Sequence, residues 1–320
     1  MIEQNIRIHV AFLSLAMGMA PLALAQEMVD DDASSATPSS LDKPSPLTIT
    51  LSGGAEYQFD TDFEDDGGDY TAARFNLGIN AAMPLNDRLD LNLSLGYAHD
   101  AYDFSGTSGF AALDPWDAVN TVQAAARLEW EVNDRFTLFG GPIIGFSAES
   151  GAHFGDSVTG GGIIGFSYKV NDRVALGLGV GAMSQIEDDV AVFPIVVVRW
   201  KIDDQWSLRT GGGVGASGGG SAEVVWEFSQ GWEIAFGAGY QSRRFRLDDE
   251  DIAPDGVGDE STLPIYLRVG YSPHANVQIS AVAGIIAAGE LRLEDRDGDR
   301  VADDDIDPAP FIGVRASLRF

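Results

Sequence analysis

The chain of 320 residues has no cysteine and only four histidines. Without cysteine it can form neither disulfides nor thiolate metal sites, and we expect no lipoprotein anchor. The shortage of histidine limits general acid–base catalysis and zinc binding. The sequence also contains no P-loop, no dinucleotide-binding fingerprint and no metalloprotease motif. These absences argue against an enzyme and against a resident organic cofactor.

Positive charge is also scarce, with 20 lysines and arginines against 49 aspartates and glutamates. The net charge of −29 argues against nucleic acid as a partner, because its phosphates would be repelled. Disorder is the other explanation of such acidity, but 45% of the residues are hydrophobic and 10% are aromatic, too many for a disordered chain. The 38 glycines suit a β-rich chain better than a helical one.

A long apolar run occurs only near the start of the sequence. Residues 10–24 are mostly apolar, and residues 23–25 form a small-x-small cleavage site. We therefore predict a signal peptide over residues 1–25, followed by a flexible periplasmic leader over residues 26–46, which are rich in Asp, Ser and Pro. No later stretch approaches the roughly 20 apolar residues of a spanning helix, so membrane insertion after export requires β-strands.

The remaining residues, 47–320, repeat one hairpin pattern. Asn-Asp-Arg turns recur at residues 86–88, 133–135 and 171–173, and a related Asp-Asp-Gln turn stands at 203–205. The flanking segments alternate apolar with polar or small residues, as strands with one apolar face do. Short turns alternate with longer, mostly acidic connections, which gives about 14 strands within a range of 12–14. We predict an all-β, antiparallel up-and-down transmembrane barrel with short periplasmic turns and acidic extracellular loops.

Tryptophan positions indicate which face of the strands meets lipid. Five of the six tryptophans flank short turns and fall on the apolar face by parity. A soluble two-sheet protein has no reason to gather tryptophans at one end and on one face, whereas a membrane barrel carries such aromatic girdles at its interfaces. The predicted girdle consists of Trp130, Trp200, Trp206, Trp226, Trp232 and Phe320.

The last strand carries a family resemblance. It ends on an aromatic residue preceded by apolar residues at alternate positions: Phe320, Leu318, Ala316, Val314 and Ile312. This pattern resembles the terminal signature of Gram-negative outer-membrane β-barrel proteins. Residues 243–249, 289–295 and 307–311 look like an uncharacterised outer-membrane barrel family, known only as a domain of unknown function. The resemblance implies localisation in the cell outer membrane and recognition of the last strand by the barrel-assembly machinery, and it implies no substrate.

Charged residues of both signs point to the predicted lumen, because a charge facing lipid at mid-depth costs roughly 2–4 kcal/mol. They fit a hydrated channel, and they equally fit an ion-pair network that fills a narrow barrel. Phe193, Ile195 and Val197 also point inward by parity, which keeps a hydrophobic-solute transporter as the alternative. The predicted charged lining consists of Arg74, Asp90, Arg127, Glu129, Arg199, Arg209, Glu223, Arg268 and Arg315.

One acidic loop, residues 295–305, resembles the calcium loops of thrombospondin type 3 repeats. Calcium takes six to eight oxygen ligands, which alternating aspartates can supply. Arg300 stands where that pattern has glycine and places a cation beside the site, so a solvated loop is the alternative. On the resemblance, the calcium ligands would be Asp295, Asp297, Asp299 and Asp303.

These features together predict a passive, porin-like channel for small hydrophilic solutes, with cations favoured at the acidic mouth. Hydrophobic-solute transport and a closed structural barrel are the alternatives. A remote alternative is a lipid-modifying enzyme that uses His99, which parity places on the lipid face near Ser105 and Ser108. The expected partners are outer-membrane lipid and lipopolysaccharide, whose phosphates the loop acids could bind through divalent ions, and the barrel-assembly machinery.

Overall fold

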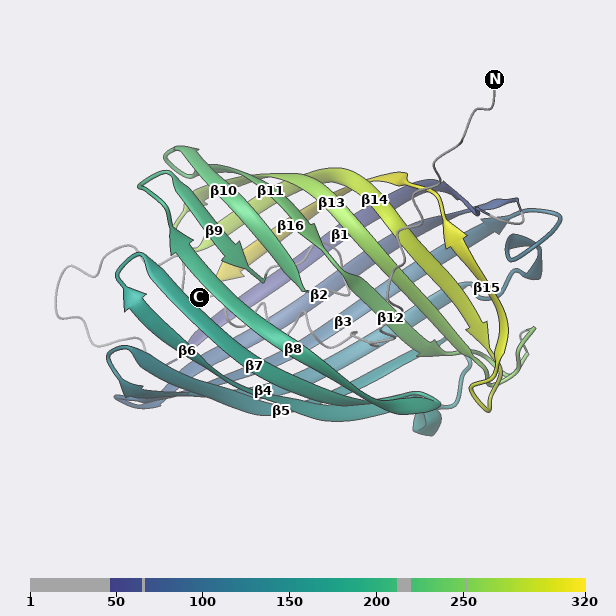
Figure 1. The fold of residues 1–320 in the computed structure, drawn as a ribbon, viewed down its shortest axis with the longest axis horizontal. Coiled ribbons are helices and arrows are strands. Elements are labelled where there is room, and N and C mark those ends of the chain that lie inside the picture. Colours follow the sequence, from purple (N-terminus) through teal and green to yellow (C-terminus); the bar gives the residue numbers. More distant parts are fainter. Residues whose placement is uncertain (1–46, 65–66, 212–219, 251) are drawn as a thin grey trace, which may run out of the picture.

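The computed structural model describes residues 47–64, 67–211, 220–250 and 252–320, so the predicted signal peptide and leader lie outside the described residues. Strands dominate this part of the chain, and no helix in it is long and apolar enough to span a membrane (Figure 1). The elements are β1 (Thr48–Asp62), β2 (Asp69–Asn86), β3 (Leu89–Ser105), η2 (Ala111–Leu113), β4 (Ala118–Asn133), β5 (Phe136–Glu149), η3 (Phe154–Ser157), β6 (Val158–Asn171), β7 (Val174–Gln185), β8 (Asp188–Lys201), β9 (Trp206–Thr210), β10 (Ser221–Ser229), β11 (Trp232–Gly239), β12 (Gln241–Arg246), β13 (Val257–His274), β14 (Val277–Glu294), β15 (Arg300–Ile306) and β16 (Ala309–Arg319).

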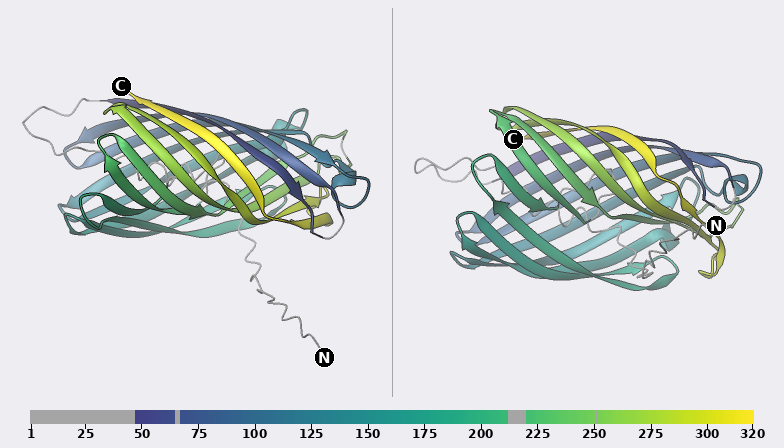
Figure 2. Two further views of the ribbon diagram at one scale, coloured as in Figure 1. Left: turned by 90° about the horizontal axis from the view of Figure 1, so that it is seen from above. Right: turned by 45° about the horizontal axis from the view of Figure 1, so that its top comes forward.

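The strands form one antiparallel sheet that closes on itself, because β1 pairs with β2 on one edge and with β16 on the other. Two pairs of segments act as single strands of the wall. β11 and β12 follow each other along β13, and β15 and β16 follow each other along β14. The result is a closed barrel of fourteen strands, which confirms the predicted fold class. Figure 2 shows the strands crossing the barrel obliquely.

The repeated Asn-Asp-Arg motifs form the short turns. In each, the first side chain accepts a hydrogen bond from the backbone N–H two residues later: Asn86 from Arg88 at 3.0 Å, Asn133 from Arg135 at 3.0 Å and Asn171 from Arg173 at 2.8 Å. Asp203 does the same with the N–H groups of Gln205 and Trp206, at 2.7 and 2.8 Å. These two hydrogen bonds hold the pKa of the Asp203 carboxyl below its ordinary value. Local side-chain chemistry therefore sets the hairpins, as the sequence predicts.

Side-chain exposure alternates along the strands and leaves an apolar outer surface. On β3, for example, Leu91 is half-buried, and Leu93 and Leu95 are exposed. Ser94, which lies between Leu93 and Leu95, is buried. All members of the predicted girdle are exposed and lie beside the short turns, and several stack across strands. The ring centroids of Trp206 and Trp226 are 5.7 Å apart. On a closed barrel, such a belt marks the lipid-facing surface.

The barrel narrows toward the end that carries the longer loops, here called the loop end. There β12 pairs in parallel with β5 through Arg246 and Ala148. Phe63, just after β1, bridges Ile306 of β15. The loop end is thus ringed by nine strands, β1 to β5 and β12 to β15, and β6 to β10 lie outside this ring. In Figure 1, β12 runs to the lower right, toward the end of the barrel at which β5 also ends.

One edge of β8 lacks a strand partner over much of its length among the described residues. β7 pairs with β8 along nearly its whole length, whereas β9 pairs only with Arg199, Trp200 and Lys201. Within the described ranges, no strand pairs with residues 188–195 on the edge away from β7. Pro194 belongs to this stretch, and a residue without an N–H is typical of an unpaired strand edge.

Candidate channel lumen

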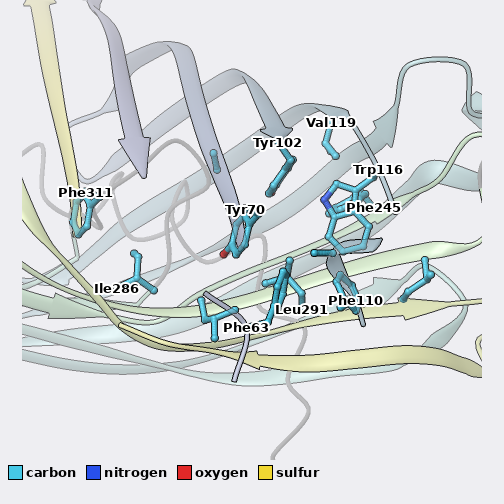
Figure 3. Close-up of a cluster of buried hydrophobic side chains, with 14 of the residues drawn as sticks. Phe63, Tyr70, Tyr102, Phe110, Trp116, Val119, Phe245, Ile286, Leu291 and Phe311 are labelled. Atoms are coloured by element: carbon cyan, nitrogen blue, oxygen red, sulfur yellow. The ribbon is translucent and has the colours of Figure 1, made fainter. Parts of the chain in front are cut away.

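The lumen at the loop end is filled by a buried apolar group, here called the mouth cluster. Figure 3 shows Trp116 against Phe245, with Tyr102, Phe110 and Phe63 around them. The Trp116 and Phe245 rings meet edge to face, with centroids 5.2 Å apart. Phe110 and Trp116 come from the connection between β3 and β4, which therefore folds into the mouth. The cluster consists mainly of Phe63, Tyr70, Tyr102, Phe110, Trp116, Phe245, Leu247, Leu291, Leu293 and Phe311.

A buried network of charges, the mouth ion network, lies against this cluster and centres on Glu260 of β13. Its carboxylate accepts hydrogen bonds from Arg74 at 2.7 Å, from Arg243 at 2.9 Å and from the Tyr102 hydroxyl at 2.7 Å. Asp100 lies 3.4 Å from the Arg243 guanidinium. Since desolvated charges are costly unless they are paired and hydrogen-bonded, this arrangement fixes β2, β3, β12 and β13 relative to one another.

A second group, the wall ion network, lies nearer the short turns on β9, β10, β11 and β13. Glu223 is its centre and is almost fully buried. Arg268 and Arg209 donate to its carboxylate at 2.8 and 3.0 Å, and the Tyr266 hydroxyl donates at 3.1 Å. Arg268 also reaches Glu233 at 2.5 Å. These residues occupy neighbouring strands, so the network lies along one side of the lumen.

The adjoining side of the lumen, formed by β4 to β8, is largely apolar. Its buried residues form a separate cluster, here called the apolar wall: Ala125, Phe139, Ile143, Ile163, Met183, Phe193, Ile195 and Val197. Aromatic rings on this wall lie over glycines of the next strand, Phe193 over Gly181 and Phe139 over Gly165. A side chain at either glycine would collide with the ring, so glycine lets the ring lie against the wall instead of projecting into the lumen.

The predicted charged lining divides among these groups. Arg74 belongs to the mouth ion network, and Arg209, Glu223 and Arg268 belong to the wall ion network. Arg127 pairs with Glu129, and its guanidinium carbon lies 5.9 Å from the centre of the Phe139 ring. The remaining three are half-buried: Asp90, Arg199 and Arg315. Their role as lining of a conducting path stays a prediction.

The acidic loop between β14 and β15 has a defined turn. One oxygen of the Asp295 side chain accepts hydrogen bonds from the backbone N–H groups of Asp297 and Asp299, both at 2.9 Å. Asp303 pairs with Arg300 at 2.8 Å. Over the part of the chain that the structure describes, no three His, Asp or Glu side chains converge as a metal site. Calcium binding by Asp295, Asp297, Asp299 and Asp303 stays a prediction.

The outer wall carries His99, the residue considered for a lipid-modifying enzyme. Its Nδ1 lies 3.0 Å from the side-chain oxygen of Asn120 on β4. That oxygen also accepts a hydrogen bond from the Tyr97 hydroxyl at 2.9 Å, and the Asn120 amide donates to Ser150 at 3.1 Å. The described partner of His99 is therefore the side-chain amide of Asn120. Ser150 also belongs to this hydrogen-bonded group, and the sequence analysis did not identify it.

The residues that the sequence analysis missed are concentrated on β12 and its partner. Arg243 pairs in register with Glu260, and Arg244 pairs with Asp259. All six residues of β12 are buried, so this strand has no lipid-facing side. The available signal was the loss of alternation: consecutive charged residues on one strand oppose consecutive acids on the next. Such a pair of strands is covered by protein on both faces.

Comparison with known proteins supports the fold. No family model matches the chain, and no curated protein matches it. Among solved structures, an outer-membrane channel of Pseudomonas putida F1 superposes with a TM-score of 0.50 at 13% identity, covering 89% of this chain and 100% of the channel. A Pseudomonas aeruginosa FadL homologue has a TM-score of 0.45 at 12% identity, and the match covers 85% of this chain and 90% of the homologue. The P. putida toluene transporter TodX has a TM-score of 0.44 at 8% identity, and the match covers 87% of this chain and 91% of the transporter. The chain thus has the fold of outer-membrane β-barrels.

Proposed function

We propose that this protein is a passive outer-membrane channel for small apolar solutes, which bypass the mouth by passing between β8 and β12 and then cross the lumen to the short-turn end. The observation that carries the proposal is the narrowing from fourteen strands to nine at the loop end. A ring of about eight strands has an interior just wide enough to be filled by side chains. The mouth cluster and the mouth ion network fill this ring with buried residues.

The edge of β8 over residues 188–195, which has no strand partner in the described part of the chain, supports a lateral route. A barrel normally pairs every backbone group, since an unpaired N–H or C=O in lipid costs several kcal/mol. The edge of residues 188–195 departs from this rule among the described residues. Val190 and Val192 on this stretch are among the exposed apolar residues, so the entrance is apolar toward the membrane.

The apolar wall supports the class of solute. Phe193, Ile195 and Val197 come from β8 itself, so a solute that enters beside β8 meets their side of the lumen. Ligand sites for apolar molecules are lined mainly by aliphatic and aromatic side chains with few polar groups. The two ion networks lie on other strands and are internally paired.

A second candidate is the hydrophilic, cation-favouring channel predicted from the sequence. It is favoured by the net charge of −29 and by the inward charges of the two ion networks. This candidate requires an axial path through the mouth, whereas the apolar route does not. The two candidates therefore differ in what happens when the nine-strand ring is locked.

The absence of cysteine makes a clean test possible. In the double variant Ala148→Cys, Arg246→Cys, the two positions are Cα partners between β5 and β12. Paired strands lie about 4.8 Å apart, and a disulfide takes Cα separations of about 4.4–6.8 Å. The refolded protein is placed in a planar bilayer for ion conductance and in liposomes for uptake of a small aromatic dye that fluoresces in lipid. The same double variant after reduction, and each single variant, are the controls.

The apolar route predicts equal dye uptake by the oxidised and reduced forms and no ion conductance by the oxidised form. Ion conductance that is present in the reduced form and lost on oxidation would favour the hydrophilic channel. Loss of dye uptake on oxidation, or uptake no faster than in protein-free liposomes, would overturn the proposed route.

A further inference from the structure

Four polar side chains gather on the lipid-facing wall around Asn120, and nothing in the channel function uses them. Tyr97 and His99 lie on β3 and point outward with the leucines of that strand. Asn120 lies opposite His99 on β4, and Ser150 follows β5. The Asn120 side chain contacts all three others, at 2.9 Å from Tyr97, 3.0 Å from His99 and 3.1 Å from Ser150. We call this group the outer polar cluster.

The height of the outer polar cluster follows from the strand register. Trp130 of the girdle pairs with Leu89, and His99 pairs with Asn120, ten residues further along both strands. Ten residues at about 3.4 Å each, on strands tilted by roughly 40°, rise about 26 Å. The apolar band of an outer-membrane barrel is about 25 Å tall. The outer polar cluster therefore lies one membrane thickness above the girdle, at the headgroups of the outer leaflet.

The hydrogen bonds decide which headgroup chemistry fits. The Asn120 oxygen is only an acceptor, so His99 binds it through Nδ1–H, and in neutral imidazole Nε2 is then an acceptor. The Ser150 hydroxyl and the second N–H of the Asn120 amide add donors and an acceptor. This mixture of donors and acceptors without fixed charge matches sugar hydroxyls. The exposed charged residues next along the two strands are Asp103 and Asp117, which disfavour a phosphate group.

We propose that Tyr97, His99, Asn120 and Ser150 form a binding site for the sugar headgroup of a glycolipid in the outer leaflet. The lipid tails would lie on Leu93, Leu95 and Val122, which are exposed directly below. Tyr97 adds an apolar ring face at the level where aromatic residues are enriched in membrane proteins. The proposal rests on the barrel fold and the register, and it is independent of what the lumen conducts.

The test is native mass spectrometry of the refolded mature protein in a neutral polyether detergent. The probes are an alkyl glucoside and an alkyl phosphocholine of equal chain length. We expect the wild-type protein to retain the glucoside in preference to the phosphocholine. Asn120→Leu removes the central amide and Ser150→Ala removes one hydroxyl, and we expect losses of glucoside affinity of about tenfold and about threefold.

Ser184→Ala is the matched control, because Ser184 is an exposed hydroxyl on β7 near the loop end and outside the outer polar cluster. Heat-modifiable gel mobility verifies that each variant folds. Equal glucoside retention by wild-type protein and both cluster variants would overturn the proposal. So would a preference for the phosphocholine, which would point to a phosphate headgroup instead.

Discussion

Arg74 and Glu260 are 186 positions apart in the sequence, yet their side chains meet at 2.7 Å and are 1% and 0% exposed. This ion pair joins β2 to β13 across the mouth and is the centre of the mouth ion network. Its consequence is a mouth held by buried charges as well as by apolar packing.

Substitution of Glu260 by alanine should destabilise the barrel by about 3–5 kcal/mol, because Arg74 and Arg243 would keep buried charges without their main partner. The measurement is urea unfolding of the refolded protein in micelles, followed by gel mobility. Glu290→Ala is the control, since Glu290 and its partner Arg292 are both partly exposed, at 33% and 30%. Equal unfolding midpoints for the two variants would contradict the central role of Glu260.

Trp116→Ala should open the mouth. Trp116 is buried and contacts Tyr102, Phe104, Phe110 and Phe245 edge to face. Its removal should cost about 3–5 kcal/mol of stability and should raise single-channel ion conductance above that of the wild-type protein. The girdle variant Trp206→Ala, on the outer surface, should leave conductance unchanged. A Trp116→Ala protein that folds and conducts no better than wild type would show that other groups close the mouth.

Phe193→Arg should reduce uptake of the aromatic dye at least about tenfold, because it places a charge on the apolar wall beside β8. Phe193→Ala is the matched control: it removes the same ring, keeps the wall apolar and should preserve most of the uptake. Liposome uptake rates, normalised to the amount of folded protein, are the readout. Similar rates for the two variants would count against a route along this wall.

The Asp203 turn should lose its stabilising contribution in acid. The two backbone hydrogen bonds lower the folded-state pKa of this carboxyl, so its contribution is fully present above the unfolded value of about 3.9. It is lost as the pH falls through the folded value. Nuclear magnetic resonance titration of the Asp203 carboxyl carbon should give a midpoint below that of a peptide covering residues 202–206. Coincident midpoints would mean that the turn does not hold the ionised form.

The sequence predicts well whatever depends on neighbours within a strand or a turn. The alternation around Leu93 and Val314 identifies lipid-facing strands, and Asn86, Asn133 and Asn171 mark the turns, because both signals arise from period-two geometry and from local hydrogen bonds. These signals are sufficient for the strand count and for the closed barrel.

The mouth could not be predicted in the same way. Trp116 lies in a connection with no periodic pattern, and its burial depends on Phe245, more than a hundred residues later. Parity rules assign each strand residue to lumen or lipid, and β12 obeys neither assignment because protein covers both its faces. The pairing of Arg246 with Ala148 depends on how far β12 bends toward β5, and no local sequence feature determines that bend.

The ring of nine strands also divides the chain into two parts. β6 to β10 are consecutive, from Val158 to Ser229, and their strands enlarge the wall outside the ring. This stretch still contacts β12 through the turn between β7 and β8, where the Ile186 carbonyl accepts a hydrogen bond from Arg244 and Glu187 pairs with Arg246. Changes elsewhere in the stretch can alter the width of the lumen, whereas changes at residues 186–187 are transmitted to the mouth, so this turn couples the side of the barrel to the seal that faces outward.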